Sequence, residues 1–414
     1  MGEKEIASSH EDQPQGSSVL ATYFNIVCLT AGVGILGLPQ SVAQGGWVSI
    51  LFIVVSAIMS IYTSLLLIQC LYAPKDRKLH TYPEIGYEAF GSIGQYTIQT
   101  CHYTILLGMA TLCILLSGKN LVAILGALGW KVKLEIMIVI SGLLIGIPYC
   151  LLRTIKEFVW MAVFGVLTTV GTLIIVVVFA LVELPLVSPS LAIKEDVVWG
   201  GLPTSLAVFS LAYAGNIVHP HFEGAMKSPK KWPTALFLGL GTVCSLYILM
   251  GIVGYYVYGN SAEEIILDNL KAVIPANISR GLITVHVLMT GPILLCSFGV
   301  EIEDKFGISS GTMGTYKTTF SRIISRAVTI VILTIIAMVI PYFMAIMGII
   351  GSFFNCLNLF HFPIFCHVKL FGLRGRSLLE YTVMTVTLVV ATICFFWGGY
   401  GSIASMVDAV KGSK

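Results

Sequence analysis

Long apolar runs, separated by short polar segments, recur along the whole chain. A helix needs about 20 mostly apolar residues to cross a bilayer, and most of the runs have about this length. Only a short turn near Met347 separates the ninth run from the tenth, so counts of ten or twelve spans stay open. The pattern predicts about eleven transmembrane helices, over residues 19–40, 47–71, 93–118, 134–152, 158–182, 200–221, 234–258, 276–300, 325–346, 348–368 and 378–400.

The segments between these runs are too short to form a soluble domain. We therefore expect an all-α, polytopic membrane domain over residues 19–400. A polar N-terminal tail, residues 1–18, precedes it, and a short C-terminal tail, residues 401–414, follows it. The N-terminal tail lacks the basic and then apolar pattern of a secretory signal peptide.

The composition supports a membrane protein. Of the 414 residues, 56% are hydrophobic and 11% are charged, whereas a soluble domain has about 25% charged residues. The ten cysteines lie inside apolar runs or near their ends, and none has zinc-site spacing, so we interpret them as small buried hydrophobic residues. The net charge of +3 gives no indication of a nucleic-acid partner.

The distribution of basic residues predicts the orientation. Short cytoplasmic loops are enriched in Lys and Arg. If the N-terminus is cytoplasmic, about two thirds of the 24 Lys and Arg residues fall on the cytoplasmic side. We therefore expect a cytoplasmic N-terminus, and with eleven spans the C-terminus lies on the opposite side.

The first apolar run contains the stretch AGVGILGLP (Ala31–Pro39). Glycine weakens a helix and proline interrupts it, and irregular backbone inside a membrane survives only where protein or a wet cavity surrounds it. Small residues also serve helix packing. Here, however, three glycines crowd together and a proline follows, which favours a broken helix that lines a site.

A second interruption, FSLAYAGNIVHP (Phe209–Pro220), lies in the sixth run. The two interruptions therefore open successive groups of five spans, although the two halves share no clear sequence identity. Paired interruptions at matching positions are typical of secondary transporters built from inverted repeats. We predict a 5+5 inverted repeat with discontinuous helices 1 and 6.

A broken helix offers free backbone groups at both of its ends. We expect the N–H groups around Val33, Gly34 and Ile35 to bind a substrate carboxylate. Gly32 and Gly34 would let the ligand approach the backbone closely. The amino group would then bind carbonyl groups at the preceding half-helix ends, around Thr30, Ala31, Ser210, Leu211 and Ala212. Tyr103 in the third span either caps this site from the opposite wall or serves only in packing.

Three stretches carry a family resemblance. FNIVCLTAGVGILGLPQSVAQGGW (Phe24–Trp47) resembles the first span of amino acid/auxin permeases. TYPEIGYEAFG (Thr81–Gly91) matches the stretch usual before that family's third span, and HPHFEGAMKSPKKWPTAL (His219–Leu236) resembles the segment after its sixth. The resemblance covers nearly the whole chain and is closest to the vacuolar and vesicular branch. It implies a LeuT-like fold with one extra span and amino acid transport driven by an ion gradient.

One departure from the family pattern bears on which ion drives transport. The sodium-coupled branch resembles FNxxNxxxGxGILGLP, whereas this chain has Asn25 at the first asparagine position and Cys28 at the second. A thiol is a poor sodium ligand, so the sequence favours protons.

Imidazole titrates near physiological pH, which makes His286 in the eighth span and His102 in the third the candidates for proton coupling. Either one is alternatively a neutral, hydrogen-bonded histidine. His219 and His221 either gate the inner exit or are plain interfacial residues.

The sequence therefore predicts a secondary active transporter of amino acids, neutral because no charge lies deep in a span, and proton-coupled. The alternatives are a sodium-coupled symporter and a transporter-like amino acid sensor. We expect no enzyme activity, no cofactor and no metal site, because metal-ligand clusters and nucleophile or phosphate-binding motifs are missing. The expected partners are an amino acid, a proton and the lipid bilayer, in a vacuolar or lysosomal membrane rather than the plasma membrane.

Overall fold

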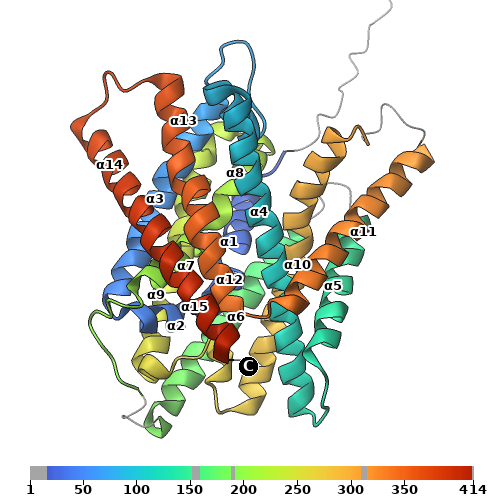
Figure 1. Ribbon diagram of the computed structural model, residues 1–414, viewed down its shortest axis with the longest axis vertical. Helices are drawn as coiled ribbons and strands as arrows, with labels where there is room; N and C mark the ends of the chain where they lie inside the picture. The colour runs from blue at the N-terminus through green and yellow to red at the C-terminus, as the bar shows by residue number, and fades with distance from the viewer. Residues whose placement is uncertain (1–15, 152–158, 188–191, 309–314, 413–414) are drawn as a thin grey trace, which may run out of the picture.

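The computed structural model describes residues 16–151, 159–187, 192–308 and 315–412. The described chain is helical apart from its loops and one isolated bridge, which confirms the all-α prediction. The helices form a bundle (Figure 1), and they are α1 (Val19–Thr30), α2 (Leu38–Gly45), α3 (Val48–Leu71), α4 (Tyr82–Ala127), α5 (Leu134–Leu151), α6 (Val159–Glu183), α7 (Leu202–Ala212), α8 (His219–Gly224), α9 (Trp232–Tyr258), α10 (Val273–Lys305), α11 (Thr315–Val339), α12 (Phe343–Ile349), α13 (Phe362–Phe371), α14 (Leu378–Ile393) and α15 (Gly399–Gly412).

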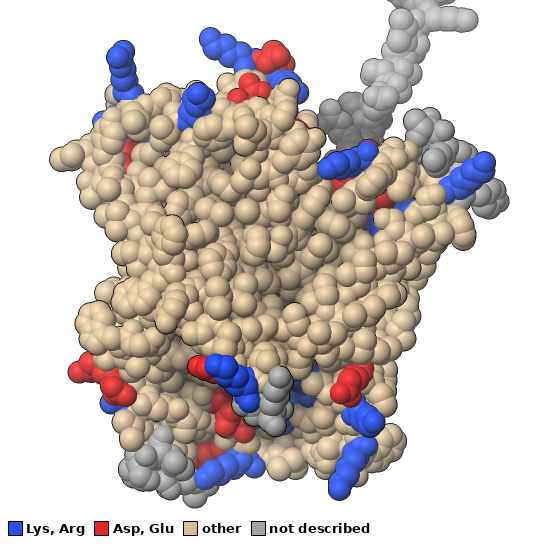
Figure 2. All heavy atoms as spheres, in the orientation of Figure 1, with Lys and Arg blue, Asp and Glu red and all other residues tan. Residues whose placement is uncertain are grey.

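The helices have the lengths that a membrane requires. Within the described residues, nine helical segments are long and apolar enough to span a bilayer, and the bent pair α1–α2 makes a tenth. The predicted sixth span is divided between α7 and α8, neither of which is long enough alone. The charged side chains on the face in Figure 2 gather at the two ends of the molecule and leave an uncharged belt between them.

Two boundaries in the second half of the chain differ from the prediction. α11 ends at Val339 and α12 begins at Phe343, so the turn between spans 9 and 10 lies at residues 340–342. Met347, where we predicted that turn, is inside α12. The reason is Pro341, which has no N–H to continue the helix of span 9. At the C-terminus, residues 401–412, predicted as a tail, are helical and belong to α15.

The third span is longer than the pattern predicted. α4 begins at Tyr82, eleven residues before the predicted start. The Thr81 side chain caps it by accepting a hydrogen bond from the Glu84 N–H. Gly91 then kinks the helix, with a φ of 64° that only glycine adopts without strain. The apolar pattern missed this first part because polar residues interrupt it and its buried and exposed positions alternate.

The helices pack in two groups. α1, α2, α3, α7, α8 and α9 form the first group, in which α7 also packs against α12 and α15, whereas α4, α5, α10 and α11 form the second. We call the end of the molecule that carries α8 and the loop 72–81 the upper end, and the end that carries the loops 128–133 and 259–272 the lower end (Figure 1). Both broken spans belong to the first group and face the second.

Candidate functional site

The first predicted break is present at the predicted place. α1 ends at Thr30, a five-residue 3-10 turn follows at Val33–Gly37, and α2 begins at Leu38. The directions of Val19–Thr30 and Gly34–Gly45 differ by 44°. The proline lies in the first turn of α2, where its missing N–H costs nothing. Proline therefore sets the restart of the helix, and the glycines make the break.

The second break repeats the first. α7 ends at Ala212, a 3-10 turn of five residues follows at Ala214–Val218, and α8 begins at His219 with a proline in its first turn. Four spans separate the two breaks, so the second broken span runs in the opposite direction. The discontinuous helices 1 and 6 are therefore confirmed, and their common architecture is what an inverted repeat produces.

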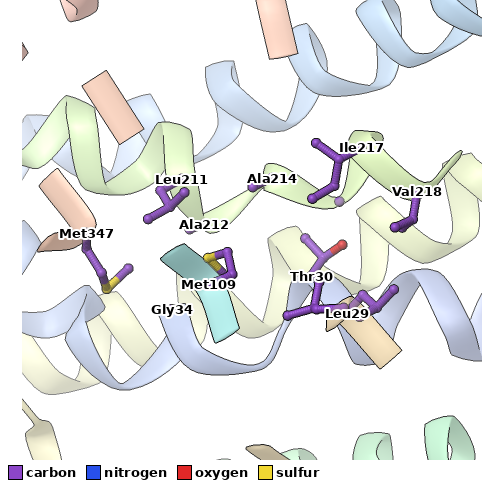
Figure 3. A pocket seen from close by; sticks show the side chains of 12 residues that line it. Leu29, Thr30, Gly34, Met109, Leu211, Ala212, Ala214, Ile217, Val218 and Met347 are labelled. Carbon is purple, nitrogen blue, oxygen red and sulfur yellow. The ribbon is translucent and has the colours of Figure 1, made fainter. Parts of the chain in front are cut away.

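A cavity lies where the two breaks face each other (Figure 3). The first broken span forms one wall, α7 and its 3-10 turn form the opposite wall, and α4, α10 and α12 contribute the rest. The open space has room for about one water molecule, so the site is closed around its own side chains. It is lined by Leu29, Thr30, Gly34, Met109, Leu211, Ala212, Ala214, Gly215, Ile217, Val218, Leu294 and Met347.

The chemistry of this lining is apolar. Its side chains are aliphatic or thioether groups, apart from the Thr30 hydroxyl, and none of them is charged. Thr30 Oγ1 is buried and has no hydrogen-bond partner among the described residues. Methionine is flexible and adapts to irregular shapes, so Met109 and Met347 are the side chains that can make room for a ligand.

Of the ten predicted substrate-site residues, the cavity lining includes Thr30, Gly34, Leu211 and Ala212. Ala31, Gly32, Val33 and Ile35 lie in the first break beside these residues but do not line the cavity. The 3-10 turn that begins at Val33 has no side-chain cap at its N-terminus, and the first N–H groups of a helix have no partner within it. The predicted carboxylate donors therefore stand next to the cavity.

The predicted carbonyl groups already have a donor. The Tyr247 hydroxyl of α9 donates to the Thr30 carbonyl and to the Ala212 carbonyl, the latter at 2.9 Å. These carbonyls end α1 and α7, where the helix dipole is negative. One phenol thus ties the two half-helix ends together at the point where a ligand ammonium was expected. Tyr247 is fully buried, and its ring lies edge-on to that of Tyr213.

Two asparagines of span 10 hold the second broken span from behind. Asn355 Nδ2 donates to the Ser210 carbonyl at 2.6 Å, so this predicted substrate acceptor is occupied by a neighbouring helix. Asn216 Nδ2 donates to the Asn358 carbonyl at 3.2 Å. Both bonds are buried. They fix the position of α7 and its 3-10 turn rather than contact the cavity.

Tyr103 lies outside the cavity lining. Its ring packs edge-on against Phe298 with a centroid distance of 5.0 Å, and its hydroxyl accepts a hydrogen bond from Gln99 Nε2 at 2.8 Å. It therefore packs between α4 and α10, nearly two helical turns from Met109 in the cavity wall, and does not cap the ligand in this closed arrangement.

His286 packs directly against the first break. An added Cβ on Gly32 would collide with its Nε2 atom. Its Nδ1 atom lies 2.9 Å from the Gly165 carbonyl, which can only accept, so Nδ1 carries a hydrogen. In a neutral ring Nε2 is then free to accept a proton. Span 8 therefore runs beside the break in span 1.

The residues around His286 are neutral. Thr169 Oγ1 lies 3.0 Å from Nδ1 and Thr290 Oγ1 lies 3.2 Å from Nε2. Cys28, at the position where the sodium-coupled pattern has asparagine, places its sulfur 3.8 Å from Thr290 Oγ1. Hydroxyl and carbonyl oxygens accept hydrogen bonds from either protonation state of an imidazole. A proton on Nε2 would place a charge beside the carbonyl end of α1, which the helix dipole favours.

His102 lies in a different environment. It is 1% exposed, and its Nε2 atom lies 3.4 Å from the Glu301 carboxylate of α10. Neither ring nitrogen has a hydrogen bond within the described part of the chain. The two predicted proton-coupling histidines are thus not one site, because one faces the first break and the other faces a carboxylate.

Sequence reasoning missed Tyr247 and most of the apolar cavity lining. Tyr247 lies in an uninterrupted apolar run, where a tyrosine gives no signal that its hydroxyl reaches two broken helices. Met109, Leu294 and Met347 likewise have the appearance of ordinary core residues. A signal was available for Glu301, since a carboxylate that follows a long apolar run without a break is unusual.

The chain is similar to known amino acid transporters. The family model of transmembrane amino acid transporter proteins matches residues 15–404. The chain is 25% identical over 407 residues to amino acid transporter AVT1B of Arabidopsis thaliana, which covers 97% of this chain and 72% of that protein. It is 24% identical to amino acid transporter AVT1I of the same plant, over 99% of both chains. The chain therefore belongs to the family of transmembrane amino acid transporter proteins.

More distant proteins share the same framework. The vesicular inhibitory amino acid transporter of Xenopus laevis is 24% identical over 98% of this chain and 80% of its own. The solved structure of MhsT in complex with L-phenylalanine superimposes with a TM-score of 0.59 at 13% identity, over 96% of this chain and all of that one. A Na+-coupled sialic acid symporter also gives 0.59 at 13% identity, over 94% and 90% of the two chains. These structures confirm the LeuT-like fold.

Proposed function

We propose that this chain is a proton-coupled carrier of neutral amino acids with apolar side chains, working by alternating access around the two helix breaks. Membership of the family supports amino acid transport. The observation that carries the finer proposal is the cavity between the breaks. Its lining is uncharged and aliphatic, and the uncapped start of the 3-10 turn at Val33 lies beside it, which suits a zwitterion whose side chain is apolar.

The two ends of the zwitterion have different binding groups. The carboxylate accepts hydrogen bonds from the N–H groups at the start of the 3-10 turn that begins at Val33, where the helix dipole is positive. The ammonium group lies near the Thr30 and Ala212 carbonyls, which Tyr247 now occupies. An ammonium has three hydrogens and a phenol has one. The bound substrate can therefore share these acceptors with Tyr247 or displace its hydroxyl from one of them.

The side chain of the substrate fills the space that Met109 and Met347 occupy in the closed cavity. Bending these thioethers away costs less than moving a branched side chain, because methionine has three rotatable bonds. A charged substrate side chain would be buried without a partner at a cost of several kcal/mol, on the order of the penalty for one buried ion. This penalty is the physical basis for the preference for neutral amino acids.

His286 is the proposed coupling residue, with His102 as the second candidate. Its Nε2 atom faces Gly32 in the first break, so a proton there changes the charge next to the substrate carboxylate. A proton and an anionic group on the two sides of one broken helix stabilise each other. This mutual stabilisation is how one binding event favours the other.

The membrane and the orientation complete the proposal. Similarity to plant amino acid transporters and to a vesicular transporter supports an internal membrane, vacuolar or lysosomal. The excess of Lys and Arg in the loops of the upper end supports a cytoplasmic upper end. The N-terminus then lies in the cytoplasm, and the lower end faces the lumen.

The test is counterflow in proteoliposomes with a panel of labelled amino acids. We expect exchange of labelled L-leucine and L-alanine but not of L-lysine or L-glutamate. An imposed pH gradient should drive accumulation, whereas a sodium gradient should not. His286→Ala should keep counterflow, which needs no net proton movement, and lose accumulation against a gradient.

The matched control is His80→Ala, because His80 is an exposed histidine of the loop 72–81. Sodium-driven accumulation that ignores pH would overturn proton coupling. Ligand-induced stabilisation of the purified protein without any flux would instead support an amino acid sensor.

A further inference from the structure

A carboxylate and two imidazoles from three helices meet near the upper end of the molecule. Glu301 of α10 lies between His102 of α4 and His221 of α8. Its Oε1 atom is 3.4 Å from His102 Nε2 and 3.6 Å from His221 Nε2. The side chains of His102, Glu301 and His221 are 1%, 11% and 25% exposed. The cluster is therefore largely buried and reaches water through His221.

The charges around this carboxylate make the imidazoles its counter-ions. From α4 the other titratable neighbour is the Tyr103 hydroxyl. On α10 itself, Lys305 lies over the Tyr96 ring, 5.6 Å from its centroid, and Asp304 is exposed. From α11, Arg326 is paired with Glu303 at 2.6 Å. A buried carboxylate requires a compensating charge, and only the two histidines stand within ion-pair distance of Glu301 in the described part of the chain.

The cluster joins the two groups of helices. His221 belongs to α8, the second half of the broken sixth span, whereas His102 and Glu301 belong to the α4–α10 pair of the opposite group. A site at the breaks can open to one side only if the broken helices move relative to the other group. Opening at the upper end must therefore separate His221 from Glu301.

The other polar contacts of α8 lie within its own group. Glu223, which is 1% exposed, accepts a hydrogen bond from Lys78 Nζ at 2.6 Å and another from the Tyr72 hydroxyl. Ser17, just before α1, forms a bridge with Met226, just after α8. These bonds make α8 move together with α1 and α3. The contact between the His221 imidazole and the Glu301 carboxylate is therefore the ionic contact that joins α8 to the second group.

We propose that the His102–Glu301–His221 cluster is a proton-held latch, which closes the upper end of the transporter when an imidazole is protonated and lets it open when that proton leaves. The inference rests on the proposed transport function and adds a gating site that is separate from His286. In the closed state one imidazolium pairs with the carboxylate, and the pair has no net charge. Release of the proton to water at the upper end leaves a neutral imidazole and an unpaired carboxylate, which gains hydration as α8 moves away.

The direction of the pH effect follows from this balance. Acid at the upper end supplies the proton and stabilises the closed latch, so it slows opening on that side. Neutral or alkaline solution removes the proton and favours opening. Without an imidazolium the latch loses its ion pair, and nitrogen–oxygen separations of 3.4 and 3.6 Å are too long for strong hydrogen bonds.

Two variants test the latch, and both preserve size. Glu301→Gln removes the anion, and His221→Gln removes the more exposed imidazole. We measure counterflow of labelled L-leucine at pH 5.5 and 7.5, equal on both sides of the membrane. The wild type should be slower at pH 5.5. Both variants should lose most of this pH dependence, because rates at acidic pH rise toward the value at neutral pH.

A second measurement needs no transport. Hydrogen–deuterium exchange of the backbone of α8 reports how often the latch opens, with labelling times scaled to the intrinsic exchange rate at each pH. The wild-type segment should be better protected at pH 5.5 than at pH 7.5, and Glu301→Gln should abolish the difference. Equal protection at both pH values in the wild type would overturn the proposal.

The controls separate the latch from general effects. His80→Gln replaces an exposed histidine at the same end and should keep the wild-type pH dependence. An unchanged pH profile in Glu301→Gln, with counterflow intact, would disprove the latch and leave the transport function standing. Failure of the wild type to exchange any amino acid would instead refute the transport function, while the exchange protection of α8 would still test the latch.

Discussion

The two ends of the molecule join the same two helix groups with different chemistry. At the lower end, Lys119 of α4 pairs with Glu264 of the loop that follows α9, with Nζ and Oε2 2.6 Å apart. At the upper end, Glu301 meets two imidazoles. An ammonium and a carboxylate keep their charges between pH 5 and 8, whereas an imidazole does not. Of these two contacts, only the upper one contains a type of side chain whose ordinary pKa lies within this range.

The helix breaks lie between these two ends. Along α10, His286 and Glu301 are fifteen positions apart, or about 22 Å at the rise of an α-helix. One contacts the first broken span and the other contacts the second. A single helix of the second group therefore carries both the histidine beside the first break and the carboxylate that meets α8.

His221→Lys should have the largest effect, because it makes the upper end resemble the lower one. A lysine keeps its charge across the working pH range, so the pair with Glu301 would no longer open when the pH rises. We expect L-leucine counterflow at pH 7.5 to fall about tenfold, which corresponds to ~1.4 kcal/mol of added stability in the closed state. Binding, measured as thermal stabilisation by the amino acid, should persist. Faster counterflow in this variant would contradict the comparison.

Tyr247→Phe acts at the centre and should affect both ends alike. The change leaves the Thr30 and Ala212 carbonyls without the hydroxyl that now joins them. A buried acceptor without a partner costs about 1–3 kcal/mol. We expect a lower melting temperature and weaker L-leucine binding, with the pH dependence of counterflow retained. A selective loss of that pH dependence would mean that the upper cluster is controlled from the centre.

Glu264→Ala tests the lower end and should have a smaller effect. Besides Lys119, the Glu264 carboxylate accepts a hydrogen bond from the Met344 N–H at 2.6 Å, in the first turn of α12. Removing it leaves that N–H without its side-chain partner at a cost of about 1–2 kcal/mol. Thermal unfolding should detect the loss, and counterflow should keep its pH profile. A flattened pH profile would show that the lower end also responds to protons.

Lys119→Met should have the smallest effect. The side chains of Lys119 and Glu264 are 23% and 30% exposed, and partly exposed ion pairs contribute about 0–1 kcal/mol. Methionine retains the aliphatic stem that packs beside the loop. The melting temperature should therefore change little, and the pH profile should match the wild type. A large destabilisation would place this pair among the structural contacts of the lower end.

Most of the framework could be read from the sequence. The apolar runs located the spans because a backbone in lipid has few alternatives to a helix. Glycine together with proline located both breaks to within a few residues. The exceptions are instructive. Pro341 ended span 9 before the predicted turn, and the amphipathic start of α4 at Tyr82 escaped a pattern tuned to continuous apolar runs.

The candidate site was less predictable. Backbone donors and acceptors followed from the breaks, because every broken helix exposes them. Which of them remain open for a ligand did not follow. The Ser210 carbonyl is taken by Asn355 and the Thr30 carbonyl by Tyr247, and these partners lie more than 140 residues away along the chain.

The sequence by itself determined that the chain is an all-helical membrane protein with two interrupted spans, because hydrophobic length and helix-breaking residues act locally. Only the tertiary structure decided which polar groups meet. Glu301, His102 and His221 come from three helices, and nothing in their spacing along the chain indicates that they share one place. Burial makes this contact important, because a carboxylate removed from water depends on the charges that the fold places beside it.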